Sequence, residues 1–387
     1  MARVVWHSCA PWARSGYGTQ TAVWIKKLTE MGHEIIVSSF YGLSGAPTQW
    51  EGITILPGFG PNYCSTSLYE HTKRINPDLV ITLGDVWVLD PKLLGQLPIA
   101  HWLPADCRPM SFADRNMVEA ANVCQLMAMS KFGFDRFSQA GFDPVYVPHG
   151  IDLDVFNIPE DREESREAMG FGDNFVIGAN LANNDAIRKA LPEIMAAFAK
   201  FHNDRPDSLL SLHTCVHQDG GQDLEFLAES LGITDLCRVV DQYSYTSGLI
   251  SDQDMAQWYG ALDVLCSASY AEGFGLPIVE AQACGIPVIT TNASSMTELN
   301  PHGIRVEGTP FWNGVHRGWW IRPDIRGIYE AFHEAYDKRD EVDPKQLRDF
   351  ARKYEVNKVA EDYMGPAVEE LGRRMAIRFP KGAANAG

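Results

Sequence analysis

The stretch from Ser267 to Asn292 limits the possible folds of this chain more than any other part of its sequence. It reads SASYAEGFGLPIVEAQACGIPVITTN. A loop with two glycines comes first, and Pro277 then stands where a helix would begin, because its fixed φ angle suits the first helical turn. Gly285 is placed to end that helix, and residues 287–291 form a short apolar run typical of a buried strand. The stretch therefore predicts a loop, a helix and a strand in immediate succession.

The same stretch predicts a binding site for a phosphate and for hydroxyl groups. The first backbone N–H groups of a helix lie at the positive end of its dipole, and a glycine-bearing loop before them lets a phosphate approach closely. The residues placed to hold the phosphate with main-chain N–H groups are Gly273, Phe274, Gly275 and Leu276. Glu272 and Glu280 flank them, and each carboxylate can accept hydrogen bonds from hydroxyls. Phosphate together with hydroxyls points to a nucleotide sugar.

Length and composition favour a globular protein of two domains. The chain has 387 residues, of which 45% are hydrophobic, and it contains no run of 18 uncharged apolar residues that could form a transmembrane segment. Its first 16 residues lack the apolar core and cleavage site of a signal peptide, and its eight cysteines form no Cys-x-x-Cys motif. We therefore expect a cytoplasmic protein with reduced thiols, without a bound metal or a cofactor.

The charge is negative and unevenly distributed. A net charge of −17 argues against general binding to nucleic acid or to an anionic membrane. Residues 1–150, however, carry 11 Lys and Arg against 12 Asp and Glu, so this half is almost neutral. The C-terminal tail is basic, with Arg373, Arg374, Arg378 and Lys381. These two features keep a lipid and a nucleic acid among the candidate partners.

Strands and helices alternate in the first 150 residues. A strand at residues 3–8, a helix at about 19–31 and a strand at 34–39 are the opening of a doubly wound parallel sheet. Residues 15–18, Ser-Gly-Tyr-Gly, lie where such sheets bind ligands, although a plain tight turn explains them equally well. Further strands are expected at residues 53–56, 78–82, 99–103, 124–129 and 145–147.

The alternation starts again near residue 175, after a charged stretch at 160–167 that marks an interdomain connection. Strands are expected at residues 175–178, 209–215, 238–240 and 264–267, and helices at 190–201, 224–231 and 252–260. Residues 304–322 look like a tryptophan-rich hairpin insertion, and helices from residue 325 close the chain. The prediction is therefore an α/β protein with two successive doubly wound domains.

Four motifs, in order along the chain, resemble those of the retaining family-four glycosyltransferases. They are Gly16-Tyr17-Gly18, Val147-Pro148-His149-Gly150-Ile151-Asp152, the pair Arg188-Lys189, and Glu272 with Glu280 around Gly273-Phe274-Gly275-Leu276-Pro277. The last motif is specific and the second fairly specific, whereas the other two are weak alone. The resemblance covers nearly the whole chain. It implies the GT-B fold, in which two Rossmann-like domains face a cleft.

The resemblance also implies how the domains divide the work of binding and which class of sugar donor is used. Residues 1–157 would bind the acceptor, residues 158–360 would bind the nucleotide sugar, and a C-terminal helix at 361–387 would cross back to the first domain. The donor would be a UDP- or GDP-sugar. In this family a basic pair replaces a metal, so Lys189 and Arg188 would neutralise the leaving diphosphate. The alternative interpretation of this pair is a surface charge pair at the start of a helix.

Other residues take their expected roles from the same resemblance. Glu280 would hold the ribose hydroxyls, and Glu272 would contact the donor sugar near its reacting carbon; both could instead be ordinary exposed carboxylates. Gly16 and Gly18 would let the first-domain loop reach the donor diphosphate. Where many relatives have an arginine, this chain has Asn180, so Arg188 is a candidate for its substitute.

Three further residues are candidates with open alternatives. His101 matches the place of a family histidine that reaches the donor sugar, and a histidine of the core is an equal alternative. Asp85 and Asp106 follow expected strands, where either could orient an acceptor hydroxyl or cap a helix.

Family resemblance implies metal-independent front-face displacement, which transfers a sugar to an acceptor hydroxyl with retention of configuration. The acceptor stays open between a small molecule, a glycan, a lipid and a modified base in phage-type DNA. The alternatives of another class are a nucleotide-sugar epimerase with the same fold and a non-catalytic sugar-binding relative. The sequence makes no prediction about oligomeric state.

Overall fold

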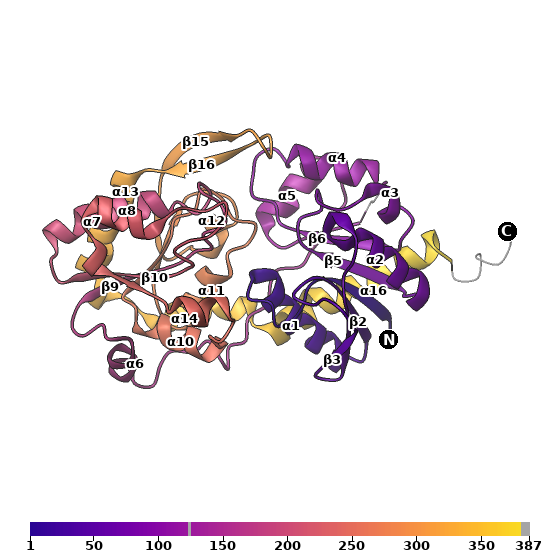
Figure 1. Cartoon of the computed structure of the whole chain (residues 1–387), viewed down its shortest axis with the longest axis horizontal. Helices are drawn as coiled ribbons and strands as arrows, with labels where there is room; N and C mark the ends of the chain where they lie inside the picture. The colour runs from indigo at the N-terminus through magenta and orange to yellow at the C-terminus, as the bar shows by residue number, and fades with distance from the viewer. Residues whose placement is uncertain (123–124, 381–387) are drawn as a thin grey trace. The chain divides into compact units, whose positions relative to one another are not determined.

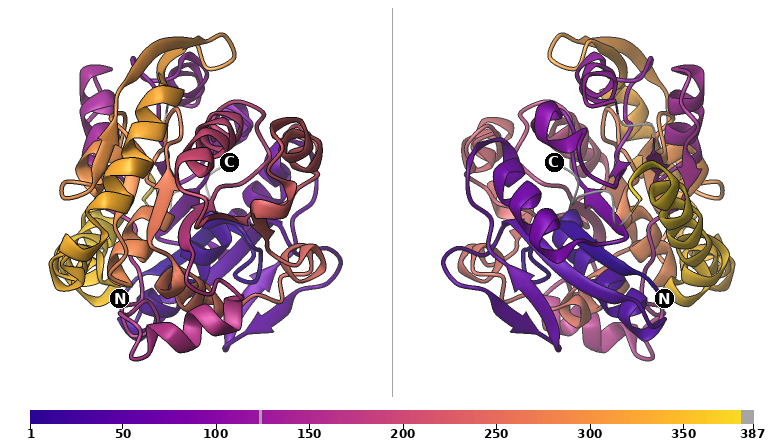
Figure 2. Two further views of the ribbon diagram at one scale, coloured as in Figure 1. Left: turned by 90° about the vertical axis from the view of Figure 1, so that its left-hand side faces the viewer. Right: turned by 90° about the vertical axis from the view of Figure 1, so that its right-hand side faces the viewer.

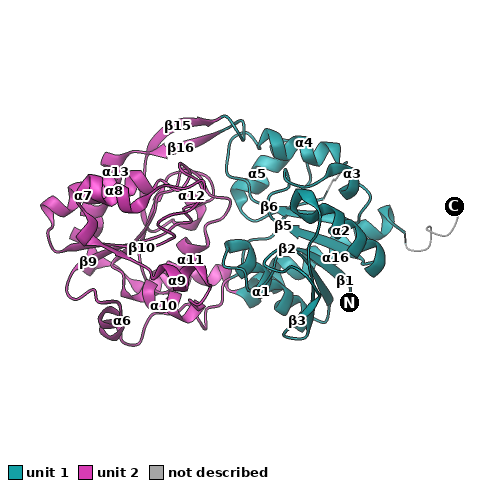
Figure 3. Ribbon diagram, in the orientation of Figure 1, with its two compact units in different colours: residues 1–150, 314–318, 356–387 teal, residues 151–313, 319–355 magenta. Residues whose placement is uncertain are grey.

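The computed structural model describes residues 1–122 and 125–380 and divides the chain into two compact units (Figure 1, Figure 3). Unit 1 comprises residues 1–150, 314–318 and 356–387, and unit 2 comprises residues 151–313 and 319–355. The first boundary, expected at residue 157, thus lies at residue 150. The C-terminal segment returns to unit 1 at residue 356 rather than 361.

Eight strands form the sheet of unit 1, in the order β3-β4-β2-β1-β5-β6-β7-β8. They are β1 (Arg3–Cys9), β2 (Glu34–Tyr41), β3 (Thr48–Trp50), β4 (Ile53–Leu56), β5 (Leu79–Leu83), β6 (Ile99–Leu103), β7 (Leu126–Ala128) and β8 (Val145–Tyr146). All neighbours are parallel except β3 and β4. Every residue of β5 and β6 is buried, as expected for parallel strands covered on both faces. The strand expected at 124–129 is β7, and residue 124 lies outside the described residues.

Helices lie on both sides of this sheet (Figure 2). They are α1 (Gly16–Glu30), α2 (Pro61–Ile75), α3 (Pro91–Leu94), α4 (Phe112–Ala120), α5 (Lys131–Gln139), α15 (Val356–Val359), the π-helix η4 (Ala360–Met364) and α16 (Gly365–Arg378). Trp102 of β6 packs edge-to-face on Trp6 of β1 and on Trp24 of α1, with ring centroids 6.1 and 6.0 Å apart. These buried rings join α1 to the centre of the sheet.

The first helix begins three residues earlier than the sequence pattern predicts. Ser15 caps it, because its hydroxyl accepts a hydrogen bond from the backbone N–H of Gly18 at 3.1 Å. Gly16 and Gly18 therefore lie in the first helical turn and not in a separate loop. A Cβ atom on Gly18 would lie 1.9 Å from the carbonyl oxygen of Ala13, so only glycine fits there.

Unit 2 contains a six-stranded parallel sheet in the order β11-β10-β9-β12-β13-β14. Its strands are β9 (Phe175–Asn180), β10 (Ser208–His213), β11 (Cys237–Val239), β12 (Val264–Ser267), β13 (Val288–Thr291) and β14 (Ile304–Val306). Its α-helices are α6 (Arg162–Met169), α7 (Leu191–Asp204), α8 (Leu224–Leu231), α9 (Gln242–Thr246), α10 (Asp252–Ala261), α11 (Leu276–Ala283), α12 (Met296–Leu299), α13 (Ile325–Asp337) and α14 (Pro344–Ala351), and its 3-10 turns are η1 (Thr234–Leu236), η2 (Arg339–Glu341) and η3 (Arg352–Tyr354). The prediction of two doubly wound α/β domains is confirmed.

The expected hairpin at residues 304–322 is only partly a hairpin. Its first strand, β14, belongs to the main sheet, and β15 (Gly308–Asn313) with β16 (Gly318–Pro323) forms a separate two-stranded sheet. Trp320 is buried and stacks on Phe311, whereas Trp319 is exposed and packs against Trp312 at 5.1 Å. The tryptophans thus pack largely within the insertion.

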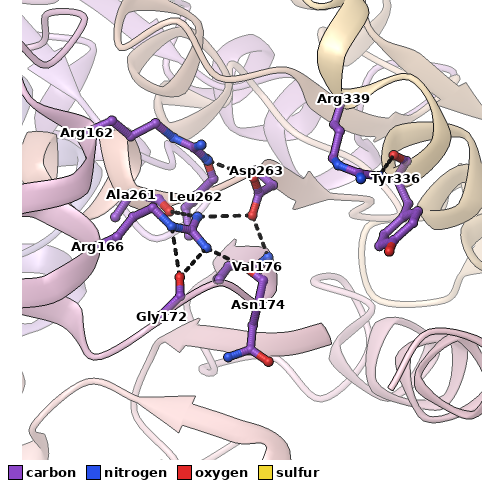
Figure 4. Close-up of polar contacts among 10 residues, drawn as sticks. All are labelled: Arg162, Arg166, Gly172, Asn174, Val176, Ala261, Leu262, Asp263, Tyr336 and Arg339. Carbon is purple, nitrogen blue, oxygen red and sulfur yellow. Dashed lines mark hydrogen bonds and ion pairs between the residues drawn. The ribbon is translucent and has the colours of Figure 1, made fainter. Parts of the chain in front are cut away.

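A buried arginine fastens α6 to the sheet of unit 2 (Figure 4). Arg166 donates to the carbonyl oxygens of Gly172 and Ala261, and one Nη lies 3.2 Å from Asp263 Oδ2. The same carboxylate accepts a hydrogen bond from the backbone N–H of Val176 at 2.7 Å. This network ties α6 to the start of β9 and to the residues just before β12.

The last helix, α16, packs within unit 1. Arg374 donates hydrogen bonds to Gln125 at 3.0 Å and to Asp143 at 3.2 Å, and Arg378 donates to the carbonyl oxygen of Asn122. Lys381, the last residue of the expected basic tail, lies outside the described residues.

Candidate functional site

The loops at the carboxyl ends of β9 and β12 bring three predicted residues together in unit 2. Arg188 and Lys189 lie between β9 and α7, and Glu272 lies between β12 and α11. The two loops are joined by their backbones, because Tyr270 donates its N–H to the carbonyl oxygen of Arg188 at 2.8 Å. This edge of the sheet is where parallel α/β folds bind ligands.

Glu272 lies between the two cations. Lys189 Nζ is 2.6 Å from Glu272 Oε1, and Arg188 Nη1 is 3.1 Å from Glu272 Oε2. The hydroxyl of Ser269 donates a third hydrogen bond to this carboxylate, at Oε1, with a distance of 2.7 Å. Burial alone would raise the pKa of Glu272, but Lys189 and Arg188 outweigh it and lower the pKa to about 2. Glu272 is therefore ionised at neutral pH.

Two consecutive serines fix the backbone of the glycine loop. The N–H of Glu272 donates to Ser294 Oγ at 2.9 Å, and Ser295 Oγ donates to the carbonyl oxygens of Glu272 and Phe274. Gly275 follows with a φ of 113°, a conformation that side chains disfavour, and a Cβ there would lie 2.9 Å from Ile278 Cδ1. The loop thus holds a rigid path into α11.

The N-terminus of α11 has the features that the sequence predicts for a phosphate cradle. The helix starts at Leu276, Pro277 lies in its first turn, and no described side chain caps it. An uncapped helix start presents backbone N–H groups and partial positive charge, which suits an anion.

Glu280 occupies a different environment on the same helix. Its Oε2 accepts a hydrogen bond from the hydroxyl of Tyr259 at 2.8 Å, and that hydroxyl accepts one from Asn180 Nδ2 at 2.8 Å. His213 Nδ1 lies 3.3 Å from Asn180 Oδ1 and extends the chain to β10. Burial raises the pKa of Glu280 to about 7, against the lowering effect of the Tyr259 hydroxyl. Glu280 therefore titrates near neutral pH.

Sequence reasoning missed several members of this site. Ser269, Ser294 and Ser295 support the loop, and Tyr259 with Asn180 supports Glu280. The sequence singles out Asn180 only because it stands where many relatives have an arginine. No local pattern marks Tyr259, because its partner lies on another helix.

In unit 1, His101 is the third residue of β6 and has no solvent exposure. Its Nδ1 lies 2.5 Å from Thr82 Oγ1, and burial lowers its pKa to about 3. These facts fit the alternative of a core histidine, so contact with a donor sugar stays a prediction.

Asp85 and Asp106 follow β5 and β6, as the sequence predicts, and both are partly exposed. Among the described helices neither caps an N-terminus, because Asp90 caps α3 and Ser111 caps α4. Asp85 accepts a hydrogen bond from the hydroxyl of Tyr17 at 3.3 Å.

The described part of the chain contains neither a metal-binding cluster nor a membrane-spanning helix. No group of three or more His, Cys, Asp or Glu side chains is arranged to hold a metal ion. None of the described helices combines the length and the apolar character that crossing a bilayer requires.

Comparison with known proteins finds a family match and several relatives. Residues 183–353 match the family described as Glycosyl transferases group 1. D-inositol 3-phosphate glycosyltransferase 2 of Catenulispora acidiphila is 31% identical over 285 residues, which cover 69% of this chain and 57% of that protein. A GDP-mannose-dependent monoacylated alpha-(1-6)-phosphatidylinositol monomannoside mannosyltransferase of Corynebacterium glutamicum is 30% identical over 204 residues, which cover 48% and 49%. The chain thus spans less than two thirds of the length of these curated relatives.

Solved structures show the same fold over nearly the whole chain. Sucrose-phosphate synthase from Thermosynechococcus elongatus has a TM-score of 0.78 at 16% identity and covers 97% of this chain and 100% of its own. HepE of Anabaena in complex with UDP and glucose has a TM-score of 0.71 at 16% identity and covers 96% and 100%. The two parallel-sheet units therefore define a protein of the GT-B class. Within that class, residues 183–353 of the chain belong to the glycosyl transferases group 1 family.

Proposed function

We propose that this protein transfers a sugar from a nucleotide-sugar donor to an acceptor hydroxyl with retention of configuration. The observation that carries the proposal is the position of Glu272 between Lys189 and Arg188, on the loop that leads into the uncapped start of α11. Two cations with one carboxylate leave a net positive charge beside a helix N-terminus. That arrangement suits a diphosphate whose negative charge increases as it leaves.

In the proposed reaction, the bond between the anomeric carbon and the diphosphate oxygen breaks. The acceptor oxygen forms its new bond to that carbon on the same face, and its proton passes to an oxygen of the departing phosphate. Lys189 and Arg188 stabilise the leaving diphosphate without a metal, and Glu272 orients both cations and the donor sugar. Glu280 accepts hydrogen bonds from the ribose hydroxyls.

Names of related proteins support a UDP- or GDP-sugar as the donor. HepE was solved with UDP-glucose, and the mannosyltransferase of Corynebacterium glutamicum is named for its dependence on GDP-mannose. Relatives are also named for an inositol phosphate and a phosphatidylinositol mannoside as acceptors, which supports a polyol, a glycan or a glycolipid here. A modified DNA base as acceptor, and epimerisation without an acceptor, stay as the alternatives.

Replacement of Lys189 by alanine tests the proposal. We expect Lys189→Ala to lower turnover by roughly 100- to 1,000-fold, because the leaving diphosphate loses a preorganised cation. The assay measures nucleotide release and glycoside formation with a panel of UDP- and GDP-sugars, with and without acceptors. Lys338→Ala is the matched control, since Lys338 forms an exposed helical ion pair with Glu334 at 2.7 Å.

The outcomes separate the alternatives. Transfer by Lys189→Ala at the wild-type rate would contradict the assignment. Release of nucleotide without an acceptor, together with an epimerised sugar, would favour the epimerase.

A further inference from the structure

The tryptophan-rich hairpin formed by β15 and β16 is fastened to the loop that carries Glu272. The residue that joins them is Tyr270, two positions before Glu272. Its carbonyl oxygen accepts a hydrogen bond from the backbone N–H of Ile321 on β16 at 3.2 Å. Its ring packs edge-to-face on that of Phe311 on β15, with centroids 5.4 Å apart. The backbone and the side chain of one loop residue thus contact both strands of the hairpin.

A buried carboxylate ties the hairpin to the helix that follows Lys189. Glu193 lies in the first turn of α7 and is 5% exposed. Its Oε1 accepts a hydrogen bond from the hydroxyl of Tyr270 at 2.7 Å and another from Nε of Arg322 on β16 at 3.2 Å. Burial, followed by the hydrogen bond to Glu193, raises the pKa of Tyr270, so its hydroxyl is protonated at neutral pH. Because burial of a carboxyl group without hydrogen bonds is costly, Glu193 holds Tyr270 and Arg322 together.

The same tyrosine is bonded to the loop of the two cations. Its backbone N–H donates to the carbonyl oxygen of Arg188 at 2.8 Å. Glu193 lies only four residues after Lys189. Both loops that bring Arg188, Lys189 and Glu272 together are thus connected to the hairpin. The ion pairs among these three side chains are 2.6 and 3.1 Å long, so a shift of about 1 Å in either loop would disturb both pairs.

We propose that the β15–β16 hairpin positions the cations of the donor site through Tyr270, Glu193 and Arg322. The inference rests on the proposed function, since it assigns supporting residues to that reaction. The three are positioning residues, because they act on the loop of Arg188 and Lys189 through the backbone of Tyr270 and the first turn of α7. Preorganised charges stabilise a transition state only when they are held in place before the reaction starts. The hairpin thus supplies part of the rigidity on which the two cations depend.

The variants Tyr270→Phe and Arg322→Met test the proposal by steady-state kinetics at a temperature well below unfolding. Each removes one hydrogen bond to Glu193 and keeps a side chain of similar size. We expect each to lower kcat roughly tenfold and to raise the donor KM less than about threefold, because the diphosphate gains negative charge as it leaves and needs the cations most in the transition state. The double variant should lose less than the product of the two single losses, since both act through one carboxylate.

Two control variants make the same chemical changes elsewhere in unit 2. Tyr329→Phe removes another phenol hydroxyl that donates to a carboxylate of α7, that of Asp204, also at 2.7 Å. Arg326→Met removes the exposed ion pair with Glu330. Both controls should keep the wild-type kcat and donor KM. Arg322→Lys, which keeps the positive charge, should recover part of the kcat that Arg322→Met loses.

Hydrogen exchange of the same proteins without ligand gives a readout that does not depend on activity. If the hairpin holds the donor loops, Tyr270→Phe and Arg322→Met should each speed exchange in peptides from residues 186–190 and 268–275 at least about fivefold, with little change in global stability. A role confined to the hairpin itself would speed exchange only in β15 and β16.

Wild-type kcat in both Tyr270→Phe and Arg322→Met, or faster exchange confined to β15 and β16, would overturn the proposal. So would an equal loss of kcat in the two control variants. A wild-type protein that transfers sugar from no donor contradicts the proposed function, and the exchange data alone then decide the positioning role. In that case, wild-type exchange of residues 268–275 in both variants would overturn the role of the hairpin.

Discussion

At the scale of single residues, two glutamates of one motif have opposite electrostatic environments. Glu272 faces Lys189 and Arg188, which hold its pKa at about 2 despite its burial. Glu280, eight positions later, accepts a hydrogen bond from the hydroxyl of Tyr259, and burial raises its pKa to about 7. Burial favours the neutral form of a carboxylic acid, and nearby cations oppose that effect more strongly than a single hydroxyl does. The two acids are therefore suited to different tasks.

The donor KM should depend on pH through Glu280. Below pH 7 the folded protein keeps this carboxyl protonated, and above pH 7 the ionised form has a second oxygen free to accept a ribose hydroxyl. We expect the donor KM to fall roughly fivefold as pH rises through about 7, because hydrogen bonds to charged groups are stronger than neutral ones. Steady-state kinetics between about pH 5.5 and 8.5 measure the donor KM as a function of pH.

The variant Tyr259→Phe tests whether Glu280 causes this pH dependence of the donor KM. The Tyr259 hydroxyl lowers the pKa of Glu280, so its removal should move the midpoint to higher pH. A midpoint that does not move would show that another group is titrating.

At the scale of elements, capping and packing shift the boundaries that periodicity predicts. Residues 99–103 and 264–267 are strands as expected, because a continuous apolar run buried on both faces has few alternatives. The start of α1 is earlier than expected, since Ser15 adds a cap that the apolar pattern does not reveal. The left-handed turn at residues 62–64 has no sequence signature, because buried contacts hold it against local preference.

Helix α6 depends on one buried ion pair, and Arg166→Met should destabilise unit 2 by about 3–5 kcal/mol. The change removes one of the two arginines that pair with Asp263 and leaves the carbonyl oxygens of Gly172 and Ala261 without the donor that Arg166 supplies. Chemical denaturation, followed by a probe in unit 2, measures the loss. Arg326→Met is the control, since Arg326 forms an exposed pair with Glu330. Equal midpoints for the two variants would show that the Arg166 network adds little stability.

At the scale of the whole molecule, the proposed donor site is contained in unit 2. The four charged residues of the site and the stretch matched by the family all lie between residues 151 and 355. Unit 1 has a sheet of its own. Donor binding can therefore be followed in unit 2 and compared with unit 1 in the same experiment.

UDP should stabilise unit 2 selectively. A ligand that binds only the native state, at a concentration of 100 times its Kd, raises the free energy of unfolding by about 2.7 kcal/mol. Amides that exchange only through global unfolding then exchange roughly 100-fold more slowly. Hydrogen exchange read by mass spectrometry should show the strongest protection in peptides from residues 268–283 and a smaller effect in β1 and β5. Lys189→Ala should lose most of this protection. Equal protection of both units would contradict a donor site within unit 2.

The sequence by itself determined the α/β class, the two domains and the position of the donor motif. These depend on short-range properties: apolar periodicity, the fixed φ of Pro277 and the conformational freedom of Gly275. Tertiary structure alone decided which groups surround each functional atom. Lys189 meets Glu272 across 83 residues, and Tyr259 meets Glu280 from another helix. The pKa of a carboxylate depends on its neighbours in space. The motif therefore predicted where the two glutamates lie along the chain, but not the difference between their pKa values.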